Sequence, residues 1–198
     1  MSRLIAVLVT ALLLPSAGFA QSVNPGDLLR ISNYLNGIGT LEGNFVQIGP
    51  DGDLSEGTFY LRRPGRMRFD YEPPNPALII ADGTWVGVCD PQINTFDRFP
   101  LSETPLDLLL RDRVDLRKEG SVQSIDRSGG QFRVKAIDPD APDQGSITMV
   151  FSDNPLQLRQ WVIVDNQGLT TTVALSETRA NVKLGGELFL IEDEICIY

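Results

Sequence analysis

Hydrophobic and polar positions alternate along much of this chain, most clearly in residues 66–71. Met67, Phe69 and Tyr71 would lie on one face of an extended strand, and the charged residues between them on the other, because side chains in a strand change face at every residue. One face of this segment is therefore apolar and the other charged. This pattern predicts a strand with one buried face.

The preceding run has the same period but ends in an arginine. Phe59, Leu61 and Arg63 would share one face, and Pro64 then breaks the strand. A guanidinium at the end of an apolar row is unusual. The pattern therefore indicates Arg63 as a candidate functional residue.

Strand-like segments continue through most of the chain after residue 41. Short runs of β-branched and aromatic residues are separated by Gly, Pro, Asp and Asn, which tolerate the backbone angles of turns. The predicted strands are 42–49, 56–63, 66–72, 77–81, 84–89, 92–98, 113–119, 121–127, 130–137, 145–152, 157–165, 169–177 and 187–191. The sequence thus predicts a mainly β, α+β protein with few helices.

Two helices interrupt this series. Asn24 and Pro25 would cap the first, in which apolar residues recur at helical spacing until Gly37 and Gly39 end the pattern. Residues 104–110 predict a second, short helix, with an N-cap threonine, a first-turn proline and four leucines. Because its leucines leave little polar surface, we expect it to cover the concave face of a curved sheet.

The first twenty residues have the pattern of a secretory signal peptide. Arg3 precedes an apolar run from Leu4 to Leu14, and small residues lead to a cleavage site after Ala20. Gln21 stands where a lipoprotein anchor would need cysteine. We therefore expect residues 21–198 to form a single domain that is free in the periplasm.

Composition narrows the classes of function. The formal net charge is −9, which argues against nucleic acid as a partner and against docking on anionic lipid by bulk attraction. The chain has no histidine, so the usual catalytic triads and imidazole metal sites are excluded. No glycine-rich phosphate loop precedes a helix, and Asp51-Gly52-Asp53 and Asp138-Pro139-Asp140 fit turns better than a calcium loop. We expect no enzyme activity, no cofactor and no metal site.

Cys89 and Cys196 are the two cysteines of the chain. In an oxidising compartment a bridge between them would close a long loop and contribute about 4 to 5 kcal/mol in the chain-entropy model. Cys196 lies near the chain end, where two free thiols are an equally good interpretation. The sequence leaves both states open. The two tryptophans, Trp85 and Trp161, are predicted to be core residues.

An ordered series of short motifs carries a resemblance to a known family. The motifs are Phe45-Val46-Gln47, Gly57 with Phe59 and Leu61, Arg63-Pro64, Arg68-Phe69-Asp70-Tyr71, Pro74, Ala81-Asp82-Gly83, Asp90-Pro91 and Thr104-Pro105-Leu106. With these motifs the chain resembles the periplasmic lipoprotein carriers of the LolA family. The resemblance covers essentially the whole of residues 21–198.

The resemblance implies an unclosed antiparallel β-barrel whose helices form a lid over an apolar cavity. Such carriers receive triacylated lipoproteins from an inner-membrane ATP-driven ABC transporter and deliver them to an outer-membrane receptor, without a cofactor or a chemical step. A monomer is the simplest form of such a lidded protein.

The resemblance also implies roles for particular residues. The family's lid-locking arginine, which bonds to backbone carbonyls of the lid helices, corresponds to Arg63. Strand parity independently places Arg63 where it could satisfy carbonyls at a helix end, or else cap the rim of the sheet in solvent. The family's lipid-contacting residue corresponds to Met67. Further candidates for acyl-chain binding, each equally consistent with plain core, are Phe59, Leu61, Phe69, Ile80, Val86, Leu106, Leu109 and Leu110.

Other functions remain open. One alternative is a periplasmic sensor or binding module of the same fold for another amphipathic ligand, which would usually carry a second domain. A carrier that also acts as the outer-membrane acceptor is another, while Gln21 argues against a membrane-anchored acceptor. A purely structural envelope protein is disfavoured by the apolar lid helix.

Overall fold

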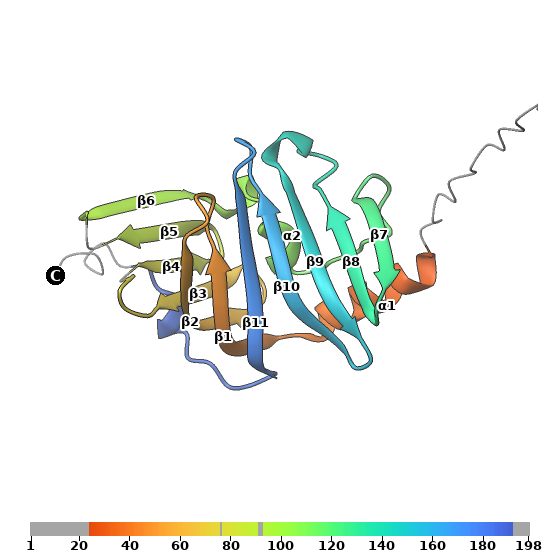
Figure 1. Cartoon of the computed structure of the whole chain (residues 1–198), viewed down its shortest axis with the longest axis horizontal. Helices are drawn as coiled ribbons and strands as arrows, with labels where there is room; N and C mark the ends of the chain where they lie inside the picture. Colours follow the sequence, from red (N-terminus) through yellow and green to blue (C-terminus); the bar gives the residue numbers. More distant parts are fainter. Residues whose placement is uncertain (1–23, 76, 91–92, 192–198) are drawn as a thin grey trace, which may run out of the picture.

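A computed structural model describes residues 24–75, 77–90 and 93–191. Its centre is one antiparallel sheet with the strand order β6-β5-β4-β3-β2-β1-β11-β10-β9-β8-β7 (Figure 1). The strands are β1 (Thr40–Ile48), β2 (Leu54–Arg62), β3 (Arg66–Tyr71), β4 (Leu78–Asp82), β5 (Trp85–Asp90), β6 (Thr95–Pro100), β7 (Val122–Ser128), β8 (Gln131–Ala136), β9 (Ser146–Asp153), β10 (Leu156–Val164) and β11 (Thr170–Ala180).

The path of the chain explains why this sheet is not a closed barrel. Strands β1 to β6 run outward as a meander, the chain crosses to the far edge, and β7 to β11 return until β11 pairs with β1. The strands β6 and β7 thus form the two edges and do not pair with each other within the described part of the chain. The prediction of a mainly β protein with an unclosed antiparallel sheet is confirmed.

The crossing segment contains the short helical elements. It comprises the 3-10 helix η1 (Leu101–Glu103) and the helix α2 (Asp107–Leu110), and α2 lies behind the sheet in Figure 1. The predicted helix 104–110 is therefore correct in place but wrong at its start. Thr104 is not the N-cap, because its hydroxyl donates to the Leu101 carbonyl at 2.8 Å and closes η1 instead.

The longer helix, α1 (Pro25–Gly37), follows its predicted pattern. The side chain of Asn24 accepts a hydrogen bond from the Gly26 amide at 2.9 Å, and the buried face consists of Leu28, Ile31, Ser32 and Leu35. The helix contacts strands β8 to β10. There Tyr34 meets Phe151 edge to face at 5.9 Å between ring centroids, and its hydroxyl accepts from the Leu158 amide at 2.9 Å.

Two predicted strands are wrong. Residues 113–119 form an irregular segment and turns, because their backbone bonds to α1 rather than to a strand. The Val114 amide donates to Asn36 at 2.9 Å and the Leu116 amide to Ser32 at 3.0 Å, so both apolar side chains are buried beside the helix. The segment 187–191 contains the 3-10 helix η3 (Glu187–Phe189), which contacts β3 and β4.

The remaining 3-10 helix, η2 (Pro142–Gln144), lies in the loop between β8 and β9.

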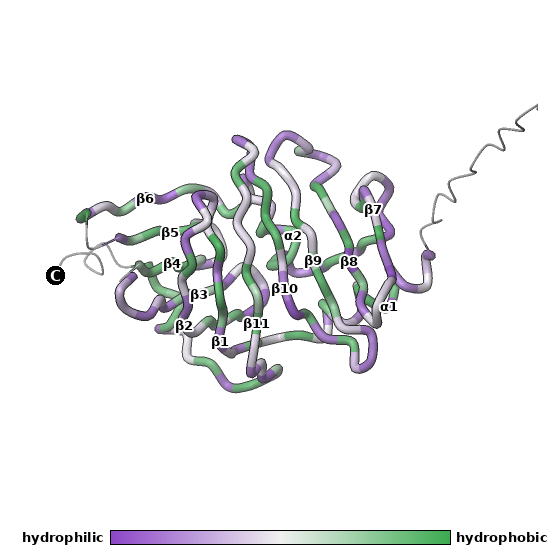
Figure 2. The backbone as a smooth tube through the Cα atoms, in the orientation of Figure 1, coloured by the Kyte–Doolittle hydropathy of each residue, from purple (hydrophilic) through white to green (hydrophobic). Residues whose placement is uncertain are grey.

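Figure 2 shows hydrophobic and hydrophilic positions interleaved along the strands, as the period of two predicts. In β8, for example, Phe132, Val134 and Ala136 are fully buried while the residues between them are exposed. The prediction of core tryptophans holds for Trp161, which is 1% exposed, but is wrong for Trp85, which is 36% exposed.

Candidate binding cavity

A cavity of about 490 Å³ opens between the concave side of the sheet and the crossing segment. Its most buried wall residues are apolar and come from strands of both meanders, namely Met67, Phe69, Val86, Trp161 and Val173. Other lining residues are Gln47, Tyr71, Ile79, Val88, Phe99, Glu103, Thr104, Pro105, Leu106, Gln144, Ile163, Asp165, Asn166, Gln167, Leu169 and Thr171. An apolar floor with polar groups among the loop residues suits an amphipathic ligand.

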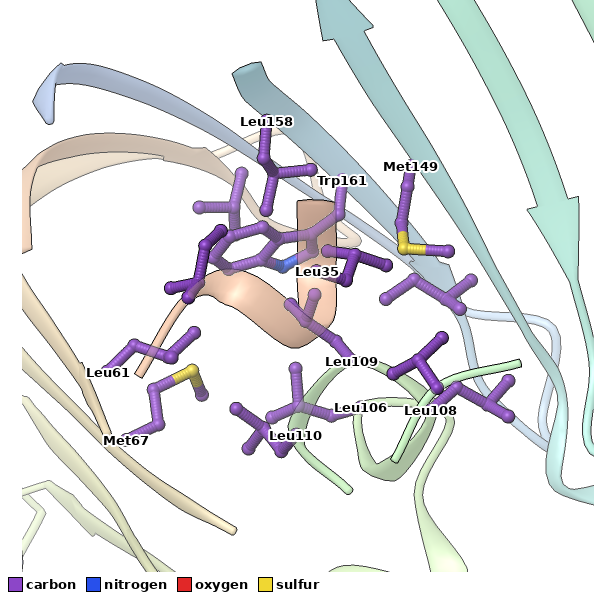
Figure 3. Close-up of a cluster of buried hydrophobic side chains, with 14 of the residues drawn as sticks. Leu35, Leu61, Met67, Leu106, Leu108, Leu109, Leu110, Met149, Leu158 and Trp161 are labelled. Atoms are coloured by element: carbon purple, nitrogen blue, oxygen red, sulfur yellow. The ribbon is translucent and has the colours of Figure 1, made fainter. Parts of the chain in front are cut away.

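Four of the predicted acyl-binding candidates line this cavity: Met67, Phe69, Val86 and Leu106. Figure 3 shows Met67 and Leu61 on one side of a buried cluster, with Trp161 and Leu35 facing the leucines of the crossing segment. The candidates Phe59, Leu61, Leu109 and Leu110 belong to this buried core and are not among the lining residues. Whether any of these residues contacts an acyl chain stays a prediction.

The predicted candidate Ile80 faces away from the cavity. In the β3–β4 register Phe69 lies opposite Ile79, while Arg68 on the outer face lies opposite Ile80. Ile79 therefore lines the cavity, and Ile80 is buried on the other side of the sheet. The strand pattern could not settle this choice because residues 78–81 are all apolar, so they carry no alternation that identifies a face.

Aromatic rings in and behind the cavity wall pack against one another. Phe69 contacts Phe45 edge to face at 4.6 Å and Trp161 at 6.1 Å between ring centroids. Phe45 in turn meets Tyr71 at 5.0 Å. Because the rings come from β1, β3 and β10, they connect the two meanders across the centre of the sheet.

Arg63, in the turn between β2 and β3, reaches both lid helices. Its Nη1 donates to the Leu35 carbonyl in the last turns of α1. Its Nη2 and Nε donate to the Arg111 carbonyl at the end of α2, the latter at 3.2 Å. Nη2 also lies 3.3 Å from Asn36 Oδ1 and 3.3 Å from the Asp112 carbonyl. One guanidinium thus joins the C-terminal ends of two helices, whose last carbonyls lack partners within the helix.

Burial lowers the pKa of Arg63, and the nearby Asp112 opposes this change. The guanidinium nevertheless remains charged at neutral pH, since arginine ionises only at far higher pH. Positive charge at a helix C-terminus is favourable because the peptide dipoles leave partial negative charge there.

The same turn holds α2 by a second contact. The Gly65 amide donates to the Leu110 carbonyl at 2.8 Å. Gly65 has φ +75°, and a Cβ there would lie 2.6 Å from Gly83 Cα, so the turn requires glycine at this position. The sequence motif Arg63-Pro64-Gly65 therefore supplies both a long side chain and a close backbone approach to the helix end.

The Arg111 side chain connects the same end of α2 to the loop after β8. Arg111 forms ion pairs with Asp107 and Asp138, each at 2.7 Å. The Arg111 guanidinium lowers the pKa of Asp138. The amide of Asn36 donates to the Val114 carbonyl at 2.8 Å. The segment from α2 to Val114 is thus tied to β2, to α1 and to the loop after β8.

A polar pair in the cavity wall was not recognised from the sequence. The Tyr71 hydroxyl donates to Gln47 Oε1 at 2.9 Å. Burial raises the pKa of Tyr71 to about 12, against the opposing effect of the hydrogen bond with Gln47. The parity that groups Tyr71 with Met67 and Phe69 was a signal for it, but no local pattern indicates which distant residue it meets.

Outside the cavity, Cys89 is buried on β5 and disulfide-bonded. The other cysteine of the chain, Cys196, at which the sequence left a bridge or a free thiol open, lies outside the described residues. Among residues 24–191 apart from the three undescribed positions, no group of three or more Cys, Asp or Glu side chains could hold a metal ion. No helix in the described part of the chain is long and apolar enough to cross a membrane.

A half-closed antiparallel sheet, an apolar cavity on its concave side and helices clasped over it define the class of lidded binding proteins for apolar groups. The family comparison is more specific. Residues 36–192 match the model of the LolA family, described as outer membrane lipoprotein carrier protein, and the chain belongs to this family.

Relatives with this description are distant but of similar length. An outer-membrane lipoprotein carrier protein of Methylobacillus flagellatus is 25% identical over 194 residues, covering 93% of this chain and 91% of that protein. One of Halorhodospira halophila is 29% identical over 208 aligned positions, covering 97% and 92%. The crystal structure of a putative outer membrane lipoprotein-sorting protein domain from Vibrio parahaemolyticus has a TM-score of 0.52 at 9% identity, covering 84% of this chain and 97% of that one. The structural similarity supports the fold alone.

Proposed function

We propose that this protein is a periplasmic carrier that shields the acyl chains of lipoproteins between the inner and the outer membrane. The observation that carries the proposal is the apolar cavity beneath a segment that Arg63 clasps at its end. Family membership supports the cargo class. The proposed role requires no catalysis, cofactor or metal.

Physical chemistry explains why such a carrier is needed. Each methylene exposed to water costs about 0.8 kcal/mol, so the chains of a triacylated lipoprotein cannot cross an aqueous compartment unshielded. The carrier must also release its cargo without an energy source of its own. A wall with a flexible methionine, Met67, and an adaptable opening suits reversible binding better than a rigid pocket does.

In this proposal Arg63 holds the empty form closed. Its hydrogen bonds join the turn after β2 to backbone carbonyls at the ends of α1 and α2. In this proposal these hydrogen bonds break when the lid opens and re-form when it closes. Ligand that binds the open form better would shift the population toward it. Residues 1–20 act as the cleaved export signal, and residues 21–198 act as one monomeric domain. The donor is an inner-membrane ABC transporter, and the acceptor is an outer-membrane receptor.

The test is release of cargo. Residues 21–198 are incubated with inner-membrane vesicles that hold a labelled triacylated lipoprotein and an active transporter, and soluble complex is quantified. We expect stoichiometric complex with the wild type, and altered retention or onward transfer with Arg63→Leu.

Arg62→Leu is the matched control. Arg62 is the preceding residue on the opposite face of β2, and it forms no hydrogen bond or ion pair with any described side chain. It should behave like the wild type. Absence of soluble complex while the transporter is active would overturn the carrier proposal, and equal effects of both substitutions would overturn the role of Arg63.

A further inference from the structure

The Gln47–Tyr71 pair is a polar feature within a largely apolar wall. Gln47 on β1 lies opposite Val173 in the register with β11, and Tyr71 ends β3 beside the rings of Phe45 and Phe69. Both Gln47 and Tyr71 line the cavity. A polar group among apolar side chains is costly unless it has a partner.

The hydrogen bond determines how the amide is oriented. The Tyr71 hydroxyl donates to Gln47 Oε1 at 2.9 Å, so the amide oxygen is turned toward the phenol. The Nε2 amino group, which has two N–H donors, therefore points away from the phenol. Within the described residues no atom accepts a hydrogen bond from Nε2, so these donors remain available in the cavity wall.

The chemistry of the ligand identifies a matching acceptor. An acyl chain is hydrocarbon except for the ester or amide carbonyl at its head, and this carbonyl accepts but does not donate. We propose that Gln47 Nε2 donates a hydrogen bond to the head carbonyl of an acyl chain in the cavity, with Tyr71 as a positioning residue. The inference rests on the proposed function and deepens it, because the site would select acyl groups over plain alkyl chains.

This contact would also fix the position of the chain. Met67 lies four positions from Tyr71 on the same face of β3, about 13 Å away at the rise of an extended strand. Phe69 lies between them. A chain whose carbonyl bonds to Gln47 would therefore run along Phe69 toward Met67, and its polar head would lie on the side of the 165–169 loop.

The experiment compares two soluble ligands that differ in the carbonyls alone. Dihexanoylglycerol has two ester carbonyls, and the dihexyl ether of glycerol has none. Binding is followed by the fluorescence of Trp161, which lines the cavity, in a Trp85→Phe background, because Trp85 is the other tryptophan and is partly exposed outside the cavity. The measured quantity is the ratio of the two dissociation constants for each variant. The difference in hydrophobicity between the two ligands is the same for every variant, so a change in the ratio reports the carbonyl contact.

Gln47→Leu keeps the approximate volume of the side chain but removes the donors. We expect it to shift the ratio about three- to tenfold toward the ether, which corresponds to one hydrogen bond. Tyr71→Phe frees the amide to rotate and should give a smaller shift in the same direction. Thr172→Val is the control, since it also removes a hydroxyl group but from the opposite face of β11, outside the cavity lining, and should leave the ratio unchanged.

The outcomes separate this inference from the proposed function. If the wild type binds neither ligand, the proposed function fails and the inference fails with it. If the wild type binds both and Gln47→Leu leaves the ratio unchanged, the inference alone is overturned. A shift in Thr172→Val as large as in Gln47→Leu would also overturn it, because the preference would then not depend on the amide.

Discussion

The two meanders of the sheet have the same alternating sequence pattern but use their concave faces differently. In β8 and β9 the inward residues Phe132, Val134, Ile147 and Met149 are fully buried, in one cluster with apolar side chains of α1. In β3 to β6 the inward residues include Met67, Val88 and Phe99, which line a cavity, and Phe99 is 37% exposed. Strands β7 to β9 (the packed meander) thus form a packed core, whereas β1 to β6 (the open meander) form the wall of a binding site together with β10 and β11.

The difference lies in what covers each face. α1 is fixed over the packed meander by an ion pair of Arg30 with Asp153 at 2.6 Å and by the contacts of Tyr34. The open meander faces the short crossing segment, which Arg63 and Arg111 hold at the end of α2. A period of two predicts that a strand has an apolar face. Whether that face becomes core or cavity depends on the size and attachment of the element opposite to it.

Two methionines, one in each region, give the largest expected difference between core and cavity wall. Met149 is fully buried in the packed meander, and Met67 is 3% exposed in the cavity wall. We expect Met149→Ala to lower the free energy of unfolding by about 2–5 kcal/mol, because it leaves a void in a packed core. Met67→Ala should cost about 1–2 kcal/mol, since part of that side chain already faces empty space.

Urea denaturation of the two variants measures this difference, and acyl-ligand affinity provides the second readout. Met67→Ala should weaken binding, whereas Met149→Ala should not do so under conditions where it is folded. Equal losses of stability, together with equal effects on binding, would contradict the distinction between core and wall.

Substitution of Arg63 tests whether the lid segment can be loosened without loosening the packed strands. Arg63→Leu leaves helix-end carbonyls without their charged donor, and we expect a loss of about 2 kcal/mol in the free energy of unfolding. Amide hydrogen exchange should become faster in residues 101–116 and stay unchanged in β8 and β9. Uniformly faster exchange across the sheet would show that Arg63 supports the whole fold rather than the lid.

A smaller effect is expected at Asp138, where the carboxylate anchors the crossing segment through Arg111. Asp138→Asn should lower the free energy of unfolding by roughly 1 kcal/mol at neutral pH. Arg111 holds the pKa of Asp138 below its ordinary value of 3.8, so this stabilisation is present above that pH and is lost as the pH falls through the lowered value.

Urea titrations of wild type and Asp138→Asn at several pH values test this sign. The two proteins should differ at neutral pH and converge in acid. A difference that grows as the pH falls would contradict the assignment of the ion pair.

Much of the secondary structure follows from the sequence because strand alternation and turn residues are local properties. Met67, Phe69 and Tyr71 share a face as their parity predicts. The errors concern interactions between distant segments. Residues 113–119 have strand-like composition, but their amides bond to α1, and Ile80 is distinguished from Ile79 only by its register with β3.

For the candidate site, the sequence indicated individual residues but not the distant residues that they contact. Arg63 was recognisable from its place at the end of an apolar row, although its carbonyl partners at Leu35 and Arg111 lie on separate helices. Trp85 was predicted as core because tryptophan is usually buried, yet it lies on the outer face with the Arg98 guanidinium 4.9 Å from its ring centroid. The pairing of Gln47 with Tyr71 depends on strand order, which composition does not reveal.

We expect acyl chains to bind in the cavity formed by β3 to β6 together with β10 and β11, and not in the packed core at β8 and β9. The most direct test is to load the protein with a lipoprotein whose acyl chains carry a photoreactive diazirine, irradiate the complex, and map the labelled residues by mass spectrometry. We expect labels at cavity residues such as Met67, Val86 and Trp161, and none at Phe132 or Met149. Labels concentrated on β8 and β9, or on the outer face of the sheet, would contradict it.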